Sequence, residues 1–160
     1  MVDINWCKEQ SRGIRLIEPN NNLCKEYIES AEETLSILKD LENKSNMWLA
    51  TTKYYCEYFM IYALLMKIGV KCEIHDCTIE LCKILEKEKI LPKDYYLKLE
   101  KDKKLRIDNQ YYLKNIYVKI DFQELVDFVL SIKNIINSLT LERINKIREI
   151  IKNQNENEQR

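Results

Sequence analysis

The sequence predicts an all-α protein: an up-and-down bundle of four to five long helices. The chain has 160 residues, a length typical of one domain. It contains only two glycines and two prolines, too few for a β sandwich with its many tight turns. Charged residues make up 32% of the chain and hydrophobic residues 46%, which suits a well-solvated helical bundle.

Three regions are expected along the chain. Residues 1–21 show little periodicity and form an N-terminal arm, residues 22–152 form the bundle, and residues 153–160 form a polar tail. The asparagines after Pro19 supply a helix cap, and apolar residues at helical spacing then predict the first long helix from about Leu23 to Leu41.

The second helix begins near Ser45 or Asn46 and stops at Gly69, a residue type favoured just beyond a helix end. Residues 54–65 are apolar on nearly all sides, so this helix belongs at the centre of a bundle or between two subunits. Asp76 is a plausible N-cap for the third helix, which ends before Pro92.

The fourth helix follows Pro92 and reaches about Tyr112. Asp121 begins a capping box, after which Phe122, Leu125 and Val129 start a long amphipathic pattern. This last pattern either runs unbroken to Ile151 or restarts at Thr140.

The first residues lack a basic segment followed by an apolar run, so no secretion signal is expected. The longest uncharged apolar run, residues 58–66, is too short for a membrane span. These features predict a cytoplasmic protein whose six cysteines are reduced thiols that pack as small hydrophobic side chains.

One group of possible metal ligands lies close together in the sequence: Cys72, His75, Cys77 and Cys82. Without a Cys-x-x-Cys pair they do not favour a zinc site, and no metal or cofactor is predicted.

Several enzyme classes are disfavoured by the motifs that the chain lacks. Two glycines, Gly13 and Gly69, cannot build a phosphate-binding loop, and there is no Gly-x-Ser-x-Gly motif of a serine hydrolase. Thiol catalysis would need a cysteine beside His75, the only histidine, and Cys72 is one candidate by proximity.

Two segments are the most informative: the aromatic helix at residues 51–59 and the segment at residues 104–112. Arg106 presents a planar charged fork that suits phosphate. Tyr111, about 140° further round a helix, would border the same cleft without stacking on Arg106. Simpler interpretations treat the aromatics as core, His75 as a capping or hydrogen-bonding residue, and Arg106 as a partner for neighbouring acids such as Asp102 or Asp108.

The chain contains an ordered set of motifs: Tyr54-Tyr55-Cys56-x-Tyr58, Ala63-Leu64-Leu65, Gly69, His75 and the segment from Arg106 to Tyr111. Taken in this order, the set resembles HEPN-domain proteins. The likeness is greatest to small archaeal and bacterial members with a Ser-x-x-Tyr-Tyr-Ala-x-Phe helix and an Arg-x-x-Ala-Asp-Tyr segment, and residues 13–20 also resemble archaeal members. The resemblance extends from residue 6 to about residue 140. It implies a helical bundle that forms a homodimer with a cleft between subunits.

Many members of that family are ribonuclease toxins held in check by a minimal nucleotidyltransferase, and others are non-catalytic RNA- or nucleotide-associated modules. The family's ribonuclease motif is Arg, four to six residues, then His. Arg106 matches the arginine, but Tyr111 stands in place of the histidine, and His75 lies upstream. The predicted catalytic residues are therefore Arg106, Tyr111 and His75, and Arg106, Lys71, Lys104 and Asn109 are predicted to contact nucleic acid.

A tyrosine with a pKa near 10 is a poor proton acceptor at neutral pH, so binding without efficient cleavage is favoured. The alternatives are an active metal-independent ribonuclease toxin and a non-catalytic dimerisation module.

The net charge of zero is the sum of segments with opposite charge. Residues 22–43 carry six acidic and two basic side chains, whereas residues 44–71 carry four basic and one acidic. RNA binding is thus predicted to be confined to a local cleft.

Overall fold

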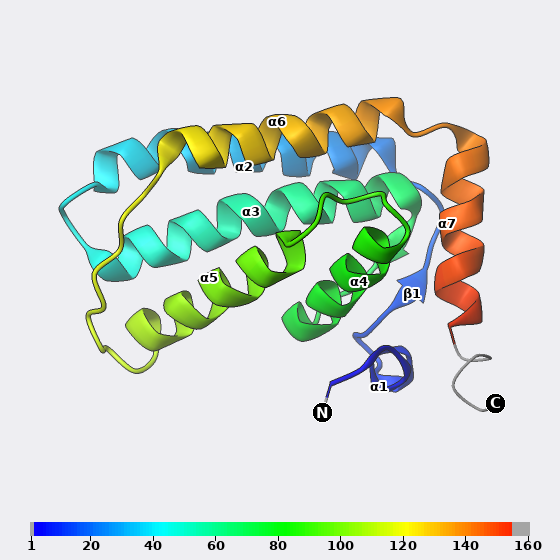
Figure 1. Cartoon of the computed structure of the whole chain (residues 1–160), viewed down its shortest axis with the longest axis horizontal. Coiled ribbons are helices and arrows are strands. Elements are labelled where there is room, and N and C mark those ends of the chain that lie inside the picture. Colours follow the sequence, from blue (N-terminus) through cyan, green and yellow to red (C-terminus); the bar gives the residue numbers. More distant parts are fainter. Residues whose placement is uncertain (1, 155–160) are drawn as a thin grey trace.

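The computed structural model describes residues 2–154 and confirms the all-α prediction. Within these residues the chain forms seven helices and one two-stranded sheet, which lies at one end of the bundle (Figure 1). Their bounds are α1 (Ile4–Glu9), β1 (Arg15–Leu16), α2 (Asn21–Leu41), α3 (Asn46–Ile68), β2 (Val70–Lys71), α4 (His75–Lys87), α5 (Tyr95–Gln110), α6 (Phe122–Ser138) and α7 (Leu141–Asn153). The predicted polar tail lies almost entirely outside the described residues.

Side-chain caps fix most of the helix starts. Asn20, Ser45 and Asp121 each accept a hydrogen bond from a backbone N–H in the first turn of α2, α3 and α6. Gly69 ends α3 in the left-handed region, with φ of 83°, a conformation that favours glycine. These starts and the end of α3 agree with the sequence prediction to within two residues.

The start of α4 differs from the prediction, and the structure settles whether the last helical pattern is continuous. Asp76 is not the N-cap of α4: the helix begins one residue earlier, at His75, and Asp76 lies in its first turn and pairs with Lys103 of α5. The last amphipathic pattern is broken rather than continuous, because Thr140 caps a new helix. Figure 1 shows α7 turning away from α6 at this point.

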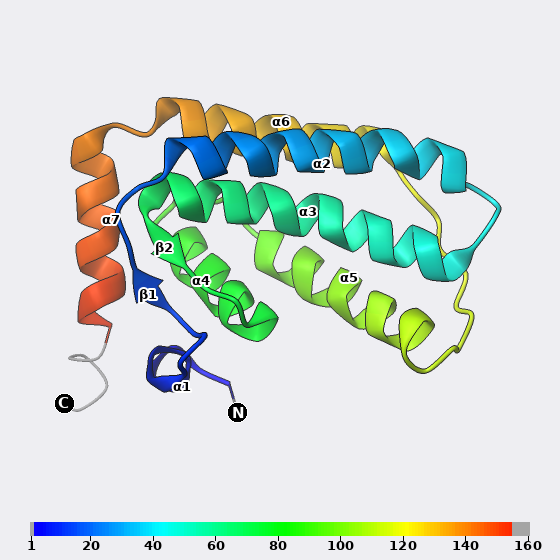
Figure 2. The ribbon, with the colours of Figure 1, turned by 180° about the vertical axis from the view of Figure 1, so that it is seen from behind.

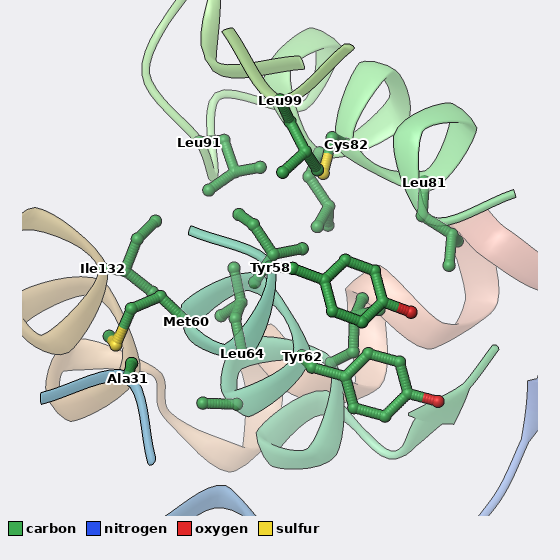
Figure 3. Packing of buried hydrophobic residues seen from close by; sticks show 14 of the residues in the cluster. Ala31, Tyr58, Met60, Tyr62, Leu64, Leu81, Cys82, Leu91, Leu99 and Ile132 are labelled. Atoms are coloured by element: carbon green, nitrogen blue, oxygen red, sulfur yellow. The ribbon is translucent and has the colours of Figure 1, made fainter. Parts of the chain in front are cut away.

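Helix α3 is the central element of the bundle. It packs against α2, α5 and α6 and also contacts α7, so its apolar residues are buried on several sides at once. Figure 2 shows α2 and α6 side by side along it, and Figure 3 shows Met60 and Leu64 of α3 packed among residues of neighbouring elements. The all-round apolar pattern is therefore explained by packing within one chain and does not require a second subunit.

The N-terminal arm is tied to the bundle. Strand β1 pairs antiparallel with β2, and a disulfide joins Cys7 of α1 to Cys77 in the first turn of α4. The prediction of six reduced thiols was wrong for these two residues, because the fold brings together positions separated by 70 residues. The other four cysteines are buried free thiols, as predicted: Cys24, Cys56, Cys72 and Cys82.

No helix within residues 2–154 is long and apolar enough to cross a membrane. The disulfide is a feature typical of oxidising compartments, so the cysteines no longer support a cytoplasmic location.

Candidate functional site

Arg106 lies on the face of α5 that packs towards α3, and only 7% of its surface is exposed. Its Nη1 donates a hydrogen bond to the Tyr55 hydroxyl at 3.0 Å. Its guanidinium carbon lies 5.0 Å from the ring centre of Tyr54 and 5.3 Å from that of Tyr55. The arginine is thus held against two aromatic rings, an arrangement that stabilises a cation.

Arg106 forms no ion pair with any residue that the structure describes. The acids that could have neutralised it are used elsewhere: Asp102 pairs with Lys53, and Asp108 pairs with Lys114 at 2.7 Å. The interpretation of Arg106 as a local ion-pair partner was therefore wrong. Its Nε is buried and has no hydrogen-bond partner among residues 2–154. A buried charge without a counter-ion costs free energy, and such groups concentrate at binding sites for oppositely charged ligands.

The tyrosines come from consecutive turns of α3. Tyr54 and Tyr58 are one turn apart and stack with ring centres 5.7 Å apart, and Tyr55 meets Tyr54 edge-on at 5.6 Å. Burial raises the pKa of Tyr54 and of Tyr58 above the usual value of a phenol, so both hydroxyls stay protonated at neutral pH. These rings are core residues, as the simpler interpretation held, and they also form the wall of the site.

His75 begins α4 and faces the same tyrosines. Its Nδ1 shares a hydrogen bond of 2.6 Å with the Tyr54 hydroxyl, and its ring stacks on Tyr58 at 4.3 Å. Burial lowers the pKa of His75 to about 4, and the positive charges of Arg106 and Lys103 add to this effect. His75 is therefore a neutral, hydrogen-bonded side chain at physiological pH.

Tyr111 follows the last residue of α5 and is 64% exposed. Its ring centre lies 5.9 Å from the guanidinium carbon of Arg106, so the two side chains make a cation–π contact. The sequence predicted that the two would border one cleft without stacking, and this contact is indeed longer than those of Arg106 with Tyr54 and Tyr55. The structure thus brings Arg106, His75 and Tyr111 around Tyr54 and Tyr55.

The other predicted contact residues lie apart from this cluster. Lys71 is in β2 and pairs with Glu73 at 2.8 Å. Lys104 is exposed, but two residues correspond to about 200° around a helix, so it lies on the side of α5 opposite Arg106. Asn109 is 2% exposed, and its amide both donates to the Ile116 carbonyl and accepts from the Ile116 N–H, so it holds the following loop.

Sequence reasoning missed a buried group of charges beside the site. Lys53 of α3 contacts Asp102 of α5 and also Glu57, one turn along α3, at 3.3 Å. Glu57 is fully buried, and burial raises its pKa to about 8. Burial opposes the charge of Lys53, but the two carboxylates outweigh it and raise the pKa of the lysine. The only local signal in the sequence is the Lys53–Glu57 spacing of four residues, which also occurs on solvent-exposed helices.

Tyr54 and Tyr55 were recognised as part of a motif but not as direct neighbours of Arg106. Their contacts depend on how α3 crosses α5, which local spacing does not reveal. No group of three or more His, Cys, Asp or Glu side chains within residues 2–154 is arranged to hold a metal ion.

Comparisons with protein-family models, with curated proteins and with solved structures found no match to this chain. The functional interpretation therefore depends on the site itself and on the ordered motifs.

Proposed function

We propose that this chain is a HEPN-type helical protein that binds RNA or a nucleotide through a phosphate held by Arg106. The observation that carries this proposal is a guanidinium that is nine-tenths buried, in cation–π contact with Tyr54 and Tyr55, and without a carboxylate partner in the described chain. A phosphate oxygen would supply the missing negative charge and accept hydrogen bonds from the guanidinium. The order of motifs that resembles the HEPN family supports the same interpretation.

Binding without efficient cleavage fits the proton-transfer groups at the site. Attack by a ribose 2′-hydroxyl needs a base that accepts a proton near neutral pH. His75, with its pKa lowered to about 4, is a weak base, and its Nδ1 is occupied by Tyr54. Tyr111 stands where the family motif has histidine, and a phenol is a poor base.

One observation favours the second candidate, an active metal-independent ribonuclease. His75 and Arg106 lie against the same ring of Tyr54, at 5.6 Å and 5.0 Å from its centre. A ligand phosphate on Arg106 would therefore have a histidine nearby. In this alternative, Arg106 stabilises the developing negative charge, and His75 and Tyr111 handle the proton.

The proposal includes a homodimer, a minimal nucleotidyltransferase as the partner in a toxin–antitoxin-like module, and a cytoplasmic location. A purely structural dimerisation module, the third alternative, loses its main support because α3 is covered within the chain. Light scattering and co-purification with the product of the neighbouring gene would test the assembly. A Cys7–Cys77 disulfide that persists in protein alkylated directly in the source cells would contradict the cytoplasmic location.

The direct test is a fluorescence-anisotropy titration of a labelled single-stranded RNA of twelve nucleotides. We expect salt-sensitive binding by the wild type, and for Arg106→Gln a loss of affinity of about tenfold or more, since hydrogen bonds to charged groups contribute about 1.5–3 kcal/mol. The slope of log K against log salt should also shrink by about 0.7 for one lost phosphate contact. Arg143→Gln on α7 is the matched control.

Removing an unpaired buried charge should leave the Tm of Arg106→Gln equal to or above that of the wild type, which separates loss of binding from loss of folding. Affinity unchanged in Arg106→Gln, or no salt-sensitive binding by the wild type, would overturn the proposal. Gel analysis of the same samples tests the ribonuclease alternative, which requires cleavage by the wild type that both Arg106→Gln and His75→Ala abolish.

A further inference from the structure

The loop that joins α5 to α6, residues 111–121, exposes large apolar side chains in close succession. Tyr111, Tyr112, Leu113 and Tyr117 are 64%, 68%, 73% and 73% exposed. Exposed single apolar residues are ordinary on a protein surface, but a contiguous set marks an interaction surface. Figure 1 shows this loop at the end of the bundle, near the turn between α2 and α3.

The exposure of these rings does not come from a loosely attached loop. Asn109 makes two hydrogen bonds to the backbone of Ile116, and Asn46 at the start of α3 bonds both to Asn115 and to the Val118 N–H. Val118 is buried in the core cluster. The backbone is thus pinned at several points while the aromatic side chains between them face outward.

The charge around the loop is mainly positive. Residues 103–121 contain five basic and two acidic side chains; of the two acids, Asp108 pairs with Lys114 and Asp121 caps α6. The Nζ of Lys114 lies 5.5 Å from the ring centre of Tyr112, so a cation sits beside an exposed aromatic face. Lys119 of the loop is exposed and makes no ion pair with any residue between 2 and 154.

The surface is also concave beside Tyr117. A cavity of about 480 Å³ lies between the loop and the start of α3, and Tyr117 and Lys44 both line it. Lys44 is exposed and likewise forms no ion pair within the described chain. An aromatic ring, an unpaired lysine and a recess therefore meet at one place.

We infer that this loop is a stacking surface for the bases of single-stranded RNA, with Tyr112 and Tyr117 as the platforms and Lys44 and Lys119 as phosphate contacts. Aromatic rings with interleaved basic side chains are the chemistry with which proteins bind single strands without sequence preference. Tyr111 contacts Arg106, so the loop continues the phosphate site outward. The inference rests on the proposed function and deepens it, by naming an unpaired strand as the ligand.

Charge favours RNA over a protein partner at this surface. The core of a protein–protein interface is depleted in lysine, whereas here Lys44 lines the same cavity as Tyr117 and Lys114 lies beside the ring of Tyr112. A duplex is excluded as the ligand, since its stacked bases leave no face for a tyrosine.

The test compares three probes of equal length: a labelled twelve-nucleotide oligouridine, the same backbone with abasic sites throughout, and an RNA duplex. The variants are Tyr112→Leu/Tyr117→Leu, which removes the rings but keeps apolar bulk, and Tyr112→Phe/Tyr117→Phe, which keeps the rings. Leu141→Ala on α7, also at a highly exposed apolar residue, is the surface control.

We expect the leucine pair to weaken oligouridine binding about tenfold or more, since each stacked base contributes about 1–3 kcal/mol. The abasic backbone should bind the wild type and the leucine pair equally weakly, and the phenylalanine pair and Leu141→Ala should resemble the wild type. Weak binding of the duplex by the wild type would complete the supporting pattern.

Equal binding of oligouridine by the leucine pair and the wild type would overturn the stacking surface, even if Arg106→Gln loses affinity and the proposed function stands. Loss of affinity in the leucine pair with none in Arg106→Gln would support the surface and overturn the phosphate site. A fall from dimer to monomer in the leucine pair, with RNA affinity unchanged, would assign the loop to a protein interface instead.

Discussion

At the scale of single residues, Arg106 and His75 owe their chemistry to burial. Arginine side chains are charged in proteins, so a buried one calls for an anion. The imidazole responds to the same surroundings by losing its charge, because burial and the nearby Arg106 and Lys103 lower its pKa to about 4. Both side chains contact the same tyrosines, but at pH 7 the arginine is positively charged and the histidine is neutral.

The lowered pKa of His75 predicts a loss of stability in acid. Between pH 6.5 and pH 4 the unfolded chain binds a proton on His75 that the folded chain does not, so the free energy of unfolding falls as the pH drops. The test is urea unfolding at pH 7.5 and at pH 4.5 with His75→Phe, which keeps a ring against Tyr58. Between these two pH values, the free energy of unfolding of the variant should fall by about 1–2 kcal/mol less than that of the wild type. The same pH dependence in both proteins would contradict this assignment.

At the scale of elements, the contact between α3 and α5 combines an apolar seam with buried charges. Glu57 is fully buried between Lys53 of its own helix and Lys98 of α5, whose Nζ lies 3.7 Å from Glu57. One Glu57 oxygen has no hydrogen-bond partner in the part of the chain that the structure describes. Since desolvation outweighs the attraction of the lysines, the carboxyl keeps its proton to about pH 8 in the folded protein.

The raised pKa of Glu57 predicts a loss of stability as the pH rises. Up to about pH 8 the folded chain holds a proton on Glu57 that the unfolded chain has released, so the free energy of unfolding falls with increasing pH. Between pH 6.5 and pH 8.5, the free energy of unfolding measured in urea should fall by about 1–2 kcal/mol more for the wild type than for Glu57→Gln. Glu124→Gln, which removes an exposed carboxylate 2.7 Å from the same Lys98, should behave like the wild type, and an identical pH response in all three proteins would refute the assignment.

At the scale of the whole molecule, the disulfide joins the arm to the bundle close to the candidate site. Cys77 is two residues from His75, and Cys7 belongs to α1, which packs on α4. The arm is thus part of the folded body, because β1 also pairs with β2. After reduction, the arm would still be held by that sheet, by the packing of α1 on α4, and by the ion pairs of Arg12 and Arg15 with Glu73.

Alkylation of the denatured, unreduced protein should modify four cysteines, and six after reduction, as read by intact mass. Cys7→Ser/Cys77→Ser should lower the free energy of unfolding by about 2–4 kcal/mol, the usual contribution of a native disulfide. The wild type in dithiothreitol should fall to the value of the variant, whereas the variant itself should not respond. Six modified cysteines without reduction would refute the disulfide.

The sequence by itself determined the helical class, the starts of α2, α3 and α6, the end of α3 at Gly69 and the central place of α3. Each of these depends on interactions within a few residues: a cap such as Asn20 or Ser45, a left-handed glycine, or apolar spacing along one helix. It also singled out Arg106, His75 and Tyr111, because they belong to an ordered set of motifs and His75 is the single histidine of the sequence.

Only the tertiary structure decided which partners these residues have. Asp102 pairs with Lys53 instead of neutralising Arg106, His75 meets Tyr54 across two helices, and Cys7 reaches Cys77. Such pairings join positions 21 to 70 residues apart, and they depend on where helices cross, which no local periodicity encodes. Burial then sets the charge of each group, so the chemistry of the site emerges only when the helices pack.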